Sequence, residues 1–122
     1  TLGVLGLGRV GREVVTRCQA FGMKVVGYDP MFPAEAARKL NIEPMTAEAA
    51  MKCSDFLTVH VPLLDETRNM INEASIASMK PGVRIVNCAR GGIIDEVALL
   101  AALESGHVAG AALDVFEAEP PA

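Results

Sequence analysis

Short apolar runs alternate with longer amphipathic segments along the whole chain. Five runs are mainly apolar and have the length of buried strands, namely residues 2–5, 25–28, 56–60, 83–86 and 108–113. The segments between them have the character of helices, namely residues 9–21, 34–40, 46–52, 72–80 and 95–105. Strands that alternate with helices predict a doubly wound parallel α/β sheet with right-handed crossovers.

The helix expected at residues 9–21 has apolar side chains at helical spacing. Its predicted buried face consists of Val10, Val14, Cys18 and Phe21, and Gly22 is expected to end it. Three polar residues precede later helical segments and are predicted N-caps, namely Thr46, Asn72 and Asp95.

Composition restricts the class of protein. A chain of 122 residues with 51% hydrophobic residues predicts one domain with a substantial core. No apolar run approaches 18 residues and no basic segment precedes one, so neither a membrane span nor a signal peptide is expected. The net charge of −4 argues against nucleic acid as a partner. The three cysteines form no metal-binding pattern, so we expect no metal site and a reducing, cytoplasmic location.

The first predicted strand runs into a G-x-G-x-x-G turn that opens the first helix. Gly6 permits the tight turn, Gly8 lets the backbone approach a pyrophosphate, and Gly11 lets the helix lie close to the strand. The start of that helix offers free N–H groups to phosphates. This arrangement predicts dinucleotide binding and a Rossmann fold. The alternative is that these glycines serve packing alone.

Asp29 follows the second predicted strand, 18 residues after Gly11, near the offset of a ribose-binding acid. A carboxylate there accepts hydrogen bonds from both hydroxyls of the adenosine ribose and repels a 2′-phosphate. NAD is therefore favoured over NADP. Glycines that served packing alone would leave the placement of this acid unexplained.

Other polar residues follow the remaining strands, where ligands of open parallel sheets bind. Arg90 comes directly after the strand at 83–86, and its guanidinium suits a carboxylate; the alternative is a loop arginine paired with a nearby acid. Asp114 follows the last strand and could hold the nicotinamide or its ribose. His60 could act as a base, but a contact with the adenosine half or a satisfied position at the edge is favoured. His107 is interpreted as structural or exposed.

Three ordered motifs resemble the D-2-hydroxyacid dehydrogenase family. They are the glycine motif at residues 6–11, the segment Asn87-Cys88-Ala89-Arg90-Gly91-Gly92 with residues 93–96, and residues 112–116 followed by Glu119-Pro120. Within this family, residues 28–30, 59–62 and 87–90 most resemble the branch that oxidises 3-phosphoglycerate with NAD at the start of serine synthesis. The resemblance covers essentially the whole chain.

The resemblance implies roles for individual residues. Arg90 would orient the substrate carboxylate and carbonyl, and Glu119 would raise the basicity of a catalytic histidine. The residues implied to bind the cofactor are Gly6, Gly8, Arg9, Val10, Gly11, Asp29, Pro30, His60, Val61, Cys88, Ala89, Arg90 and Asp114. Relatives often carry a hydroxyl residue where Val61 stands, so only a backbone contact is expected there. Unaided by the resemblance, Glu117 and Glu119 would be interpreted as a solvated acidic loop.

The resemblance also predicts what this chain lacks. The family's histidine follows the next strand, beyond Ala122, and the substrate domain is absent. We therefore expect residues 1–122 to form the NAD-binding domain, with five strands and the last strand of the sheet cut off. This chain should bind NAD(H) and turn over little or no substrate, and the full-length protein is expected to form a homo-oligomer.

Two alternatives remain open on the sequence alone. The first is another dehydrogenase of the same family, acting on glycerate, glyoxylate or lactate. The second is a non-enzymatic NAD sensor like the C-terminal-binding-protein corepressors, which share the arginine–glycine motif. Those corepressors typically have threonine where Cys88 stands and histidine where Phe116 stands, and both differences favour the biosynthetic enzyme.

Overall fold

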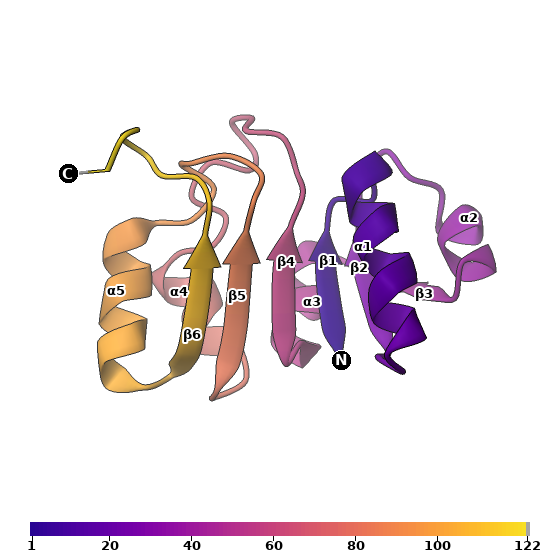
Figure 1. Ribbon diagram of the computed structural model, residues 1–122, viewed down its shortest axis with the longest axis horizontal. Coiled ribbons are helices and arrows are strands. Elements are labelled where there is room, and N and C mark those ends of the chain that lie inside the picture. The colour runs from indigo at the N-terminus through magenta and orange to yellow at the C-terminus, as the bar shows by residue number, and fades with distance from the viewer. Residues whose placement is uncertain (122) are drawn as a thin grey trace.

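The computed structural model describes residues 1–121, whose strands form a parallel sheet with helices on both faces (Figure 1). The strand order is β3-β2-β1-β4-β5-β6. The strands are β1 (Leu2–Leu5), β2 (Val25–Tyr28), β3 (Ile42–Pro44), β4 (Phe56–Val59), β5 (Val83–Asn87) and β6 (Val108–Leu113). The helices are α1 (Arg9–Ala20), α2 (Ala34–Lys39), α3 (Ala47–Cys53), α4 (Glu73–Ser78) and α5 (Glu96–Ser105). The predicted doubly wound parallel sheet is confirmed.

The predicted number of strands is wrong by one, because the sheet has six. The missed strand, β3, pairs with β2 at one edge of the sheet. It has three residues and contains Glu43 and Pro44, which are both uncommon in strands. Proline is tolerated there because an edge strand need not donate every backbone N–H to a neighbour. The expectation of a further strand beyond Ala122 lies outside the described residues.

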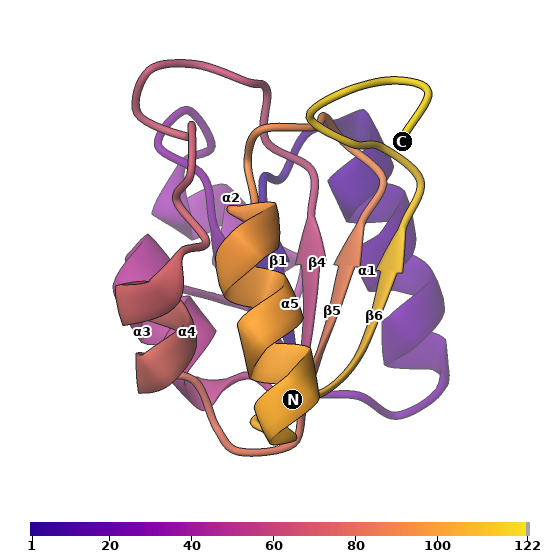
Figure 2. The same ribbon diagram turned by 90° about the vertical axis from the view of Figure 1, so that its left-hand side faces the viewer.

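The two faces of the sheet are covered by different helices. Side chains of α1 and α2 pack with β1, β2 and β3 in one cluster, which contains Val4, Val15 and Ala37. Side chains of α3, α4 and α5 pack on the opposite face in a larger cluster, which contains Leu57 and Ile85. Figure 2 shows α1 on one side of the sheet and α3, α4 and α5 on the other.

The predicted buried face of α1 is wrong at both ends. Val10 is 62% exposed and Phe21 is 87% exposed. The buried residues of the helix are Gly11 and Val15, and Val14 and Cys18 pack beside them. Phe21 lies beyond the last helical residue, so helical spacing no longer places it. Val10 lies in the first turn, where α1 extends past the end of the sheet into a cleft described below.

The predicted helix caps are confirmed. The side chains of Thr46, Asn72 and Asp95 accept hydrogen bonds from the backbone at the starts of α3, α4 and α5. Gly22 follows α1 with φ of 81°, and Gly106 ends α5 in the left-handed conformation. No helix within residues 1–121 is long and apolar enough to span a membrane.

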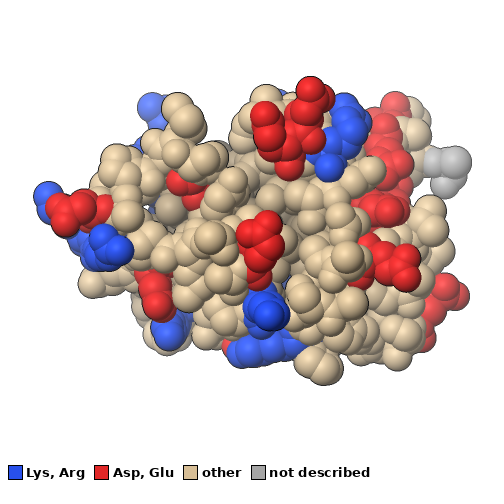
Figure 3. Space-filling view, turned by 180° about the vertical axis from the view of Figure 1, so that it is seen from behind, with Lys and Arg blue, Asp and Glu red and all other residues tan. Residues whose placement is uncertain are grey.

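Charge is distributed unevenly between the two ends of the sheet. After Arg90 the sequence contains six acidic residues and neither Lys nor Arg, whereas all 11 basic residues lie at or before Arg90. In Figure 3 one group of acidic side chains lies at the right-hand side, over α5 and the C-terminal segment, and other acidic side chains lie elsewhere on the same face. The end of the sheet beyond β5 is therefore strongly acidic, and the end that contains β1 and β2 is not.

Candidate functional site

The predicted site residues follow the carboxyl ends of the strands. All strand pairs are parallel, so the five loops that carry these residues meet at one edge of the sheet. This edge is the upper one in Figure 1, where the arrowheads of β1, β4, β5 and β6 point. The structure therefore confirms that residues 6–11, 29–30, 60–61, 88–90 and 114 share one edge.

The glycine turn between β1 and α1 is as tight as the motif predicts. Gly6 has φ of 103°, and a Cβ added there would lie 2.5 Å from the carbonyl carbon of His60. A Cβ at Gly11 would overlap the carbonyl oxygen of Gly6. Both positions therefore exclude side chains, Gly6 through conformation and contact and Gly11 through contact alone.

Gly8 differs from its neighbours because a Cβ added there would meet no atom within 4 Å. It is the N-cap of α1, and no side chain caps that helix. The first N–H that bonds within the helix is that of Arg12, which donates to the Gly8 carbonyl at 3.0 Å. The N–H groups of Arg9, Val10 and Gly11 precede it and lie at the positive end of the helix dipole. An uncapped helix start beside open space fits a diphosphate.

Asp29 is fixed in place by two backbone amides. Its Oδ2 accepts a hydrogen bond from the N–H of Leu7 at 2.8 Å, and its Oδ1 accepts one from Met31, also at 2.8 Å. The first of these bonds ties the end of β2 to the glycine turn. Each carboxylate oxygen has a second lone pair, so both can still accept a hydroxyl of a ribose.

One cavity of about 580 Å³ brings together six of the predicted site residues. We call it the Arg90 cleft; it is lined by Val10, His60, Val61, Pro62, Leu63, Cys88, Ala89 and Arg90. These residues come from the start of α1 and from the loops after β4 and β5. The cleft therefore begins at the glycine turn and ends at the arginine.

The loop that carries Arg90 is held by Asn87, which is 2% exposed at the end of β5. Its side-chain oxygen accepts a hydrogen bond from the N–H of Ala89 at 2.9 Å. Its side-chain amide donates to the carbonyl of Arg90 at 3.0 Å. Sequence reasoning included Asn87 in a motif but assigned it no role, although a buried amide after a strand is a signal for such an anchor.

Arg90 itself is exposed, and its guanidinium donates to the carbonyl of Ala89 at 2.8 Å. No ion pair holds it within the described part of the chain. The alternative of a loop arginine paired with an acid therefore gains no support. Asn87 holds the backbone that carries this side chain, and the guanidinium keeps N–H donors beyond the one that bonds Ala89. Such a group suits a small carboxylate.

His60 is half-buried in the wall of the Arg90 cleft, and burial lowers the pKa of its imidazole below the ordinary value. Burial therefore favours the neutral form of the ring. Its Nε2 lies 2.8 Å from the hydroxyl of Thr58. His107 lies at the opposite edge of the sheet, where its Nε2 is 2.9 Å from the carbonyl of Ile76. The structural interpretation of His107 is confirmed.

Asp114 and Glu119 are among the predicted residues that lie outside the lining of the Arg90 cleft. Asp114 is exposed after β6, and its N–H donates to the carbonyl of Asn87 at 3.0 Å. Glu119 is exposed, and its Oε2 accepts a hydrogen bond from the N–H of Phe116 at 3.0 Å. The segment that contains them is held to α5, since Glu96 accepts a hydrogen bond from the N–H of Glu117 at 2.8 Å. Pro30 is likewise exposed, after Asp29.

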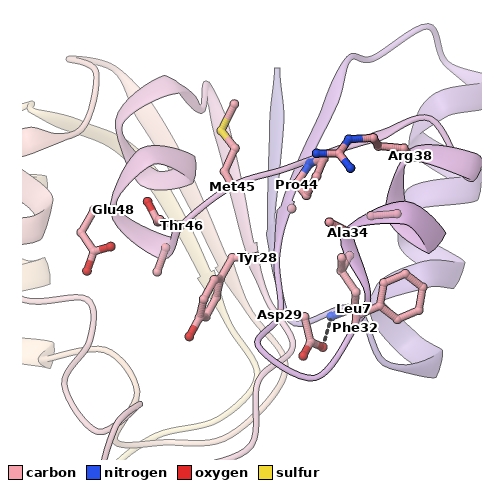
Figure 4. Close-up of a pocket in the computed structure, with 13 residues that line it drawn as sticks. Leu7, Tyr28, Asp29, Phe32, Ala34, Arg38, Pro44, Met45, Thr46 and Glu48 are labelled. Carbon is pink, nitrogen blue, oxygen red and sulfur yellow. Dashed lines mark hydrogen bonds between the residues drawn. The ribbon is translucent and has the colours of Figure 1, made fainter.

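A second cavity of about 570 Å³ lies on the other side of Asp29, and sequence reasoning missed most of it. We call it the Asp29 hollow; it is lined mainly by residues of α2, the loop after β3 and the start of α3. Figure 4 shows the Asp29 carboxylate turned toward the amide of Leu7, with Tyr28, Phe32 and Thr46 around the hollow. Met45 and Thr46 follow the strand that the sequence pattern missed, so recognising β3 would have placed them here. Within residues 1–121, no cluster of three or more His, Cys, Asp or Glu is arranged to hold a metal ion.

Comparison with known proteins gives one consistent family. The profile described as "D-isomer specific 2-hydroxyacid dehydrogenase, NAD binding domain" matches residues 1–122. The D-3-phosphoglycerate dehydrogenase of Rattus norvegicus is 58% identical over 121 residues, which cover 99% of this chain and 23% of that protein. The chain thus spans about a quarter of the length of the curated relatives that it matches.

Solved structures agree with the sequence matches. A glyoxylate reductase from Paecilomyes thermophila superposes with a TM-score of 0.90 at 43% identity, over 98% of this chain and 36% of that one. The NAD-complexed D-isomer specific 2-hydroxyacid dehydrogenase of Lactobacillus delbrueckii ssp. bulgaricus superposes with a TM-score of 0.87 at 35% identity, over 94% of this chain and 35% of that one. The chain therefore belongs to the D-isomer specific 2-hydroxyacid dehydrogenase family, and residues 1–122 match the NAD-binding domain of that family.

Proposed function

We propose that this chain is the coenzyme-binding part of an NAD-dependent dehydrogenase that oxidises 3-phosphoglycerate to 3-phosphohydroxypyruvate. The observation that carries the proposal is the continuous surface from the glycine turn through the Arg90 cleft. The resemblance to D-3-phosphoglycerate dehydrogenases, at 53–58% identity over nearly the whole chain, favours this substrate.

Each part of that surface is assigned a task. The free N–H groups at the start of α1 bind the diphosphate, and Asp29 binds the adenosine ribose. His60, Val61, Cys88 and Ala89 form the wall against which the coenzyme lies. NAD, when bound, supplies the hydride acceptor. Arg90 orients the carboxylate of the substrate beside it, and Glu119 hydrogen-bonds a histidine supplied from outside this chain.

The proposal is tested by comparing this chain with the full-length parent protein. The parent should reduce NAD in the presence of 3-phosphoglycerate. This chain should bind NADH but turn over substrate at least about 10²-fold more slowly, since neither His60 nor His107 is placed to accept the proton of the alcohol. The second candidate is a glyoxylate reductase, which the similarity to the Paecilomyes thermophila enzyme suggests. A parent protein that reduces glyoxylate faster than it oxidises 3-phosphoglycerate would favour this candidate.

The role of Asp29 can be tested on this chain by calorimetric titration with NADH and NADPH. The unaltered chain should bind NADH with a Kd between micromolar and millimolar, about −4 to −8 kcal/mol, and NADPH more weakly. Asp29→Ala should weaken NADH binding by about 10-fold and narrow the preference over NADPH, because it removes a charged acceptor for the ribose hydroxyls.

Asp29→Asn is the matched control for the structural part of this role. Its side-chain oxygen can still accept the N–H of Leu7 or of Met31, but it no longer repels a 2′-phosphate. We expect Asp29→Asn to have a free energy of unfolding between those of Asp29→Ala and the unaltered chain. It should not restore the preference for NADH over NADPH. Equal affinity of the unaltered chain for NADH and NADPH would contradict the assignment.

A further inference from the structure

Thr58 is the one buried polar residue of the described chain whose side chain bonds another side chain. The buried polar residues are Ser54, Thr58, Thr67 and Asn87. Ser54 donates to the carbonyl of Ala50, Thr67 donates to that of Pro62, and the side chain of Asn87 holds the backbone of residues 89–90. The hydroxyl of Thr58 instead lies 2.8 Å from Nε2 of His60.

The position of Thr58 would suit an apolar residue. It is 5% exposed in the interior of β4, between Leu57 and Val59, which are both fully buried. Valine has nearly the same shape and carries no hydroxyl to desolvate. A buried hydroxyl without a hydrogen bond would destabilise the fold. The bond to His60 therefore stabilises β4 and at the same time holds the imidazole ring.

The geometry of the strand explains why these two residues meet. Thr58 and His60 are two positions apart, so their side chains leave the same face of the sheet. Thr58 belongs to the ladder with β1, where it lies beside Val4. His60 stands just past the end of β4, where its N–H donates to the carbonyl of Leu5 at 2.6 Å. His60 is therefore held to the sheet at two points, its backbone N–H and the Nε2 of its ring.

The orientation of His60 matters because the ring lines the Arg90 cleft together with Val10 and Arg90. An imidazole ring can rotate about χ2 between broad, roughly two-fold related positions. A hydrogen bond at Nε2 selects one of them and leaves Nδ1 as the nitrogen free for another partner.

We propose that Thr58 is a positioning residue of the coenzyme site, whose buried hydroxyl holds the imidazole of His60 in one orientation against the bound dinucleotide. The coenzyme part of this inference rests on the proposed function. Thr58 touches no ligand itself and acts through His60. The wall of the cleft is thereby ordered before the coenzyme arrives, which lowers the entropic cost of binding.

The test combines NADH titration with NMR of the His60 ring in this chain. Thr58→Val should weaken NADH binding by about 3- to 10-fold, which is the range for one lost hydrogen bond. It should also shift the ring ¹⁵N signals of His60 and broaden them through rotation of the ring. Thr58→Ser, which keeps a hydroxyl, should restore both. Thr16→Val is the matched control, because the exposed Thr16 hydroxyl bonds only its own helix at Arg12.

A double-mutant cycle with His60→Ala separates positioning from packing. If Thr58 acts through His60, Thr58→Val should have no further effect on NADH binding in the His60→Ala background. An equal loss in both backgrounds, unchanged ring signals in Thr58→Val, or no rescue by serine would overturn the inference. If the unaltered chain fails to bind NADH, the proposed function falls and the coenzyme part of the inference falls with it. The ring signals would still decide whether Thr58 orders His60.

Discussion

Gly6→Ala is expected to remove both coenzyme binding and much of the stability of the fold. The left-handed conformation at this position costs a residue with a Cβ about 1–2 kcal/mol. The new methyl group would also lie 2.5 Å and 2.6 Å from the carbonyl carbon and oxygen of His60, so β1 and β4 would have to separate. Overpacking of this kind costs about 1–3 kcal/mol more. Urea denaturation should therefore show a loss of about 2–5 kcal/mol in the free energy of unfolding.

Gly8→Ala is the matched control for that experiment. Gly8 has φ of −74°, and a Cβ there meets no atom within 4 Å, so the free energy of unfolding should change by less than about 0.5 kcal/mol. The methyl group would occupy the space in which a diphosphate approaches the start of α1. NADH binding should therefore weaken while the fold survives. Normal NADH binding by Gly8→Ala would place the diphosphate elsewhere.

Arg90→Ala in the full-length parent is expected to lower kcat/KM for the 2-hydroxy acid by about 10²–10³-fold, the usual cost of removing one preorganised donor. NADH affinity should change far less, because most of the coenzyme surface lies between the glycine turn and Ala89. Steady-state kinetics and NADH titration on the same preparation would measure both quantities. A loss in NADH affinity as large as the loss in kcat/KM would make Arg90 a coenzyme-binding residue only.

Arg90→Lys separates charge from shape in the same assay. Lysine keeps the positive charge but lacks the planar fork that grips a carboxylate through two parallel hydrogen bonds. The guanidinium also bonds the carbonyl of Ala89, so its orientation is preset. We expect Lys to recover less than half of the lost transition-state stabilisation, and full recovery would show that charge alone suffices.

The fold could be predicted from the sequence because a parallel sheet that is covered on both faces leaves continuous apolar runs. Five of its six strands produced such runs, and β6 was predicted with its observed bounds, Val108–Leu113. The edge strand β3 escaped because three residues that include Glu and Pro carry no strand pattern. Because β3 was not predicted, the Asp29 hollow was not predicted either, since Met45 and Thr46 follow β3 and line this hollow.

The candidate site was predictable where a motif dictates local backbone and less so where residues meet through space. The glycine spacing predicted a start of α1 that is open to phosphates. The positions of the strand ends predicted that the site residues lie at one edge of the sheet. The bond between Asp29 and Leu7, by contrast, joins residues 22 positions apart and depends on the register of β1 against β2. The exposure of Val10 could not be predicted from helical spacing, because that spacing does not reveal where the sheet beneath the helix stops.

The uneven charge along the sheet gives the molecule a permanent electric polarity. A dinucleotide carries negative charge on its diphosphate, so the acidic margin at α5 repels it while the opposite margin does not. We therefore expect an approaching dinucleotide to be oriented, before any contact, with its phosphates toward α1 and away from β6. This orienting effect should extend over about one Debye length, roughly 8 Å at physiological ionic strength, and should weaken as salt is added.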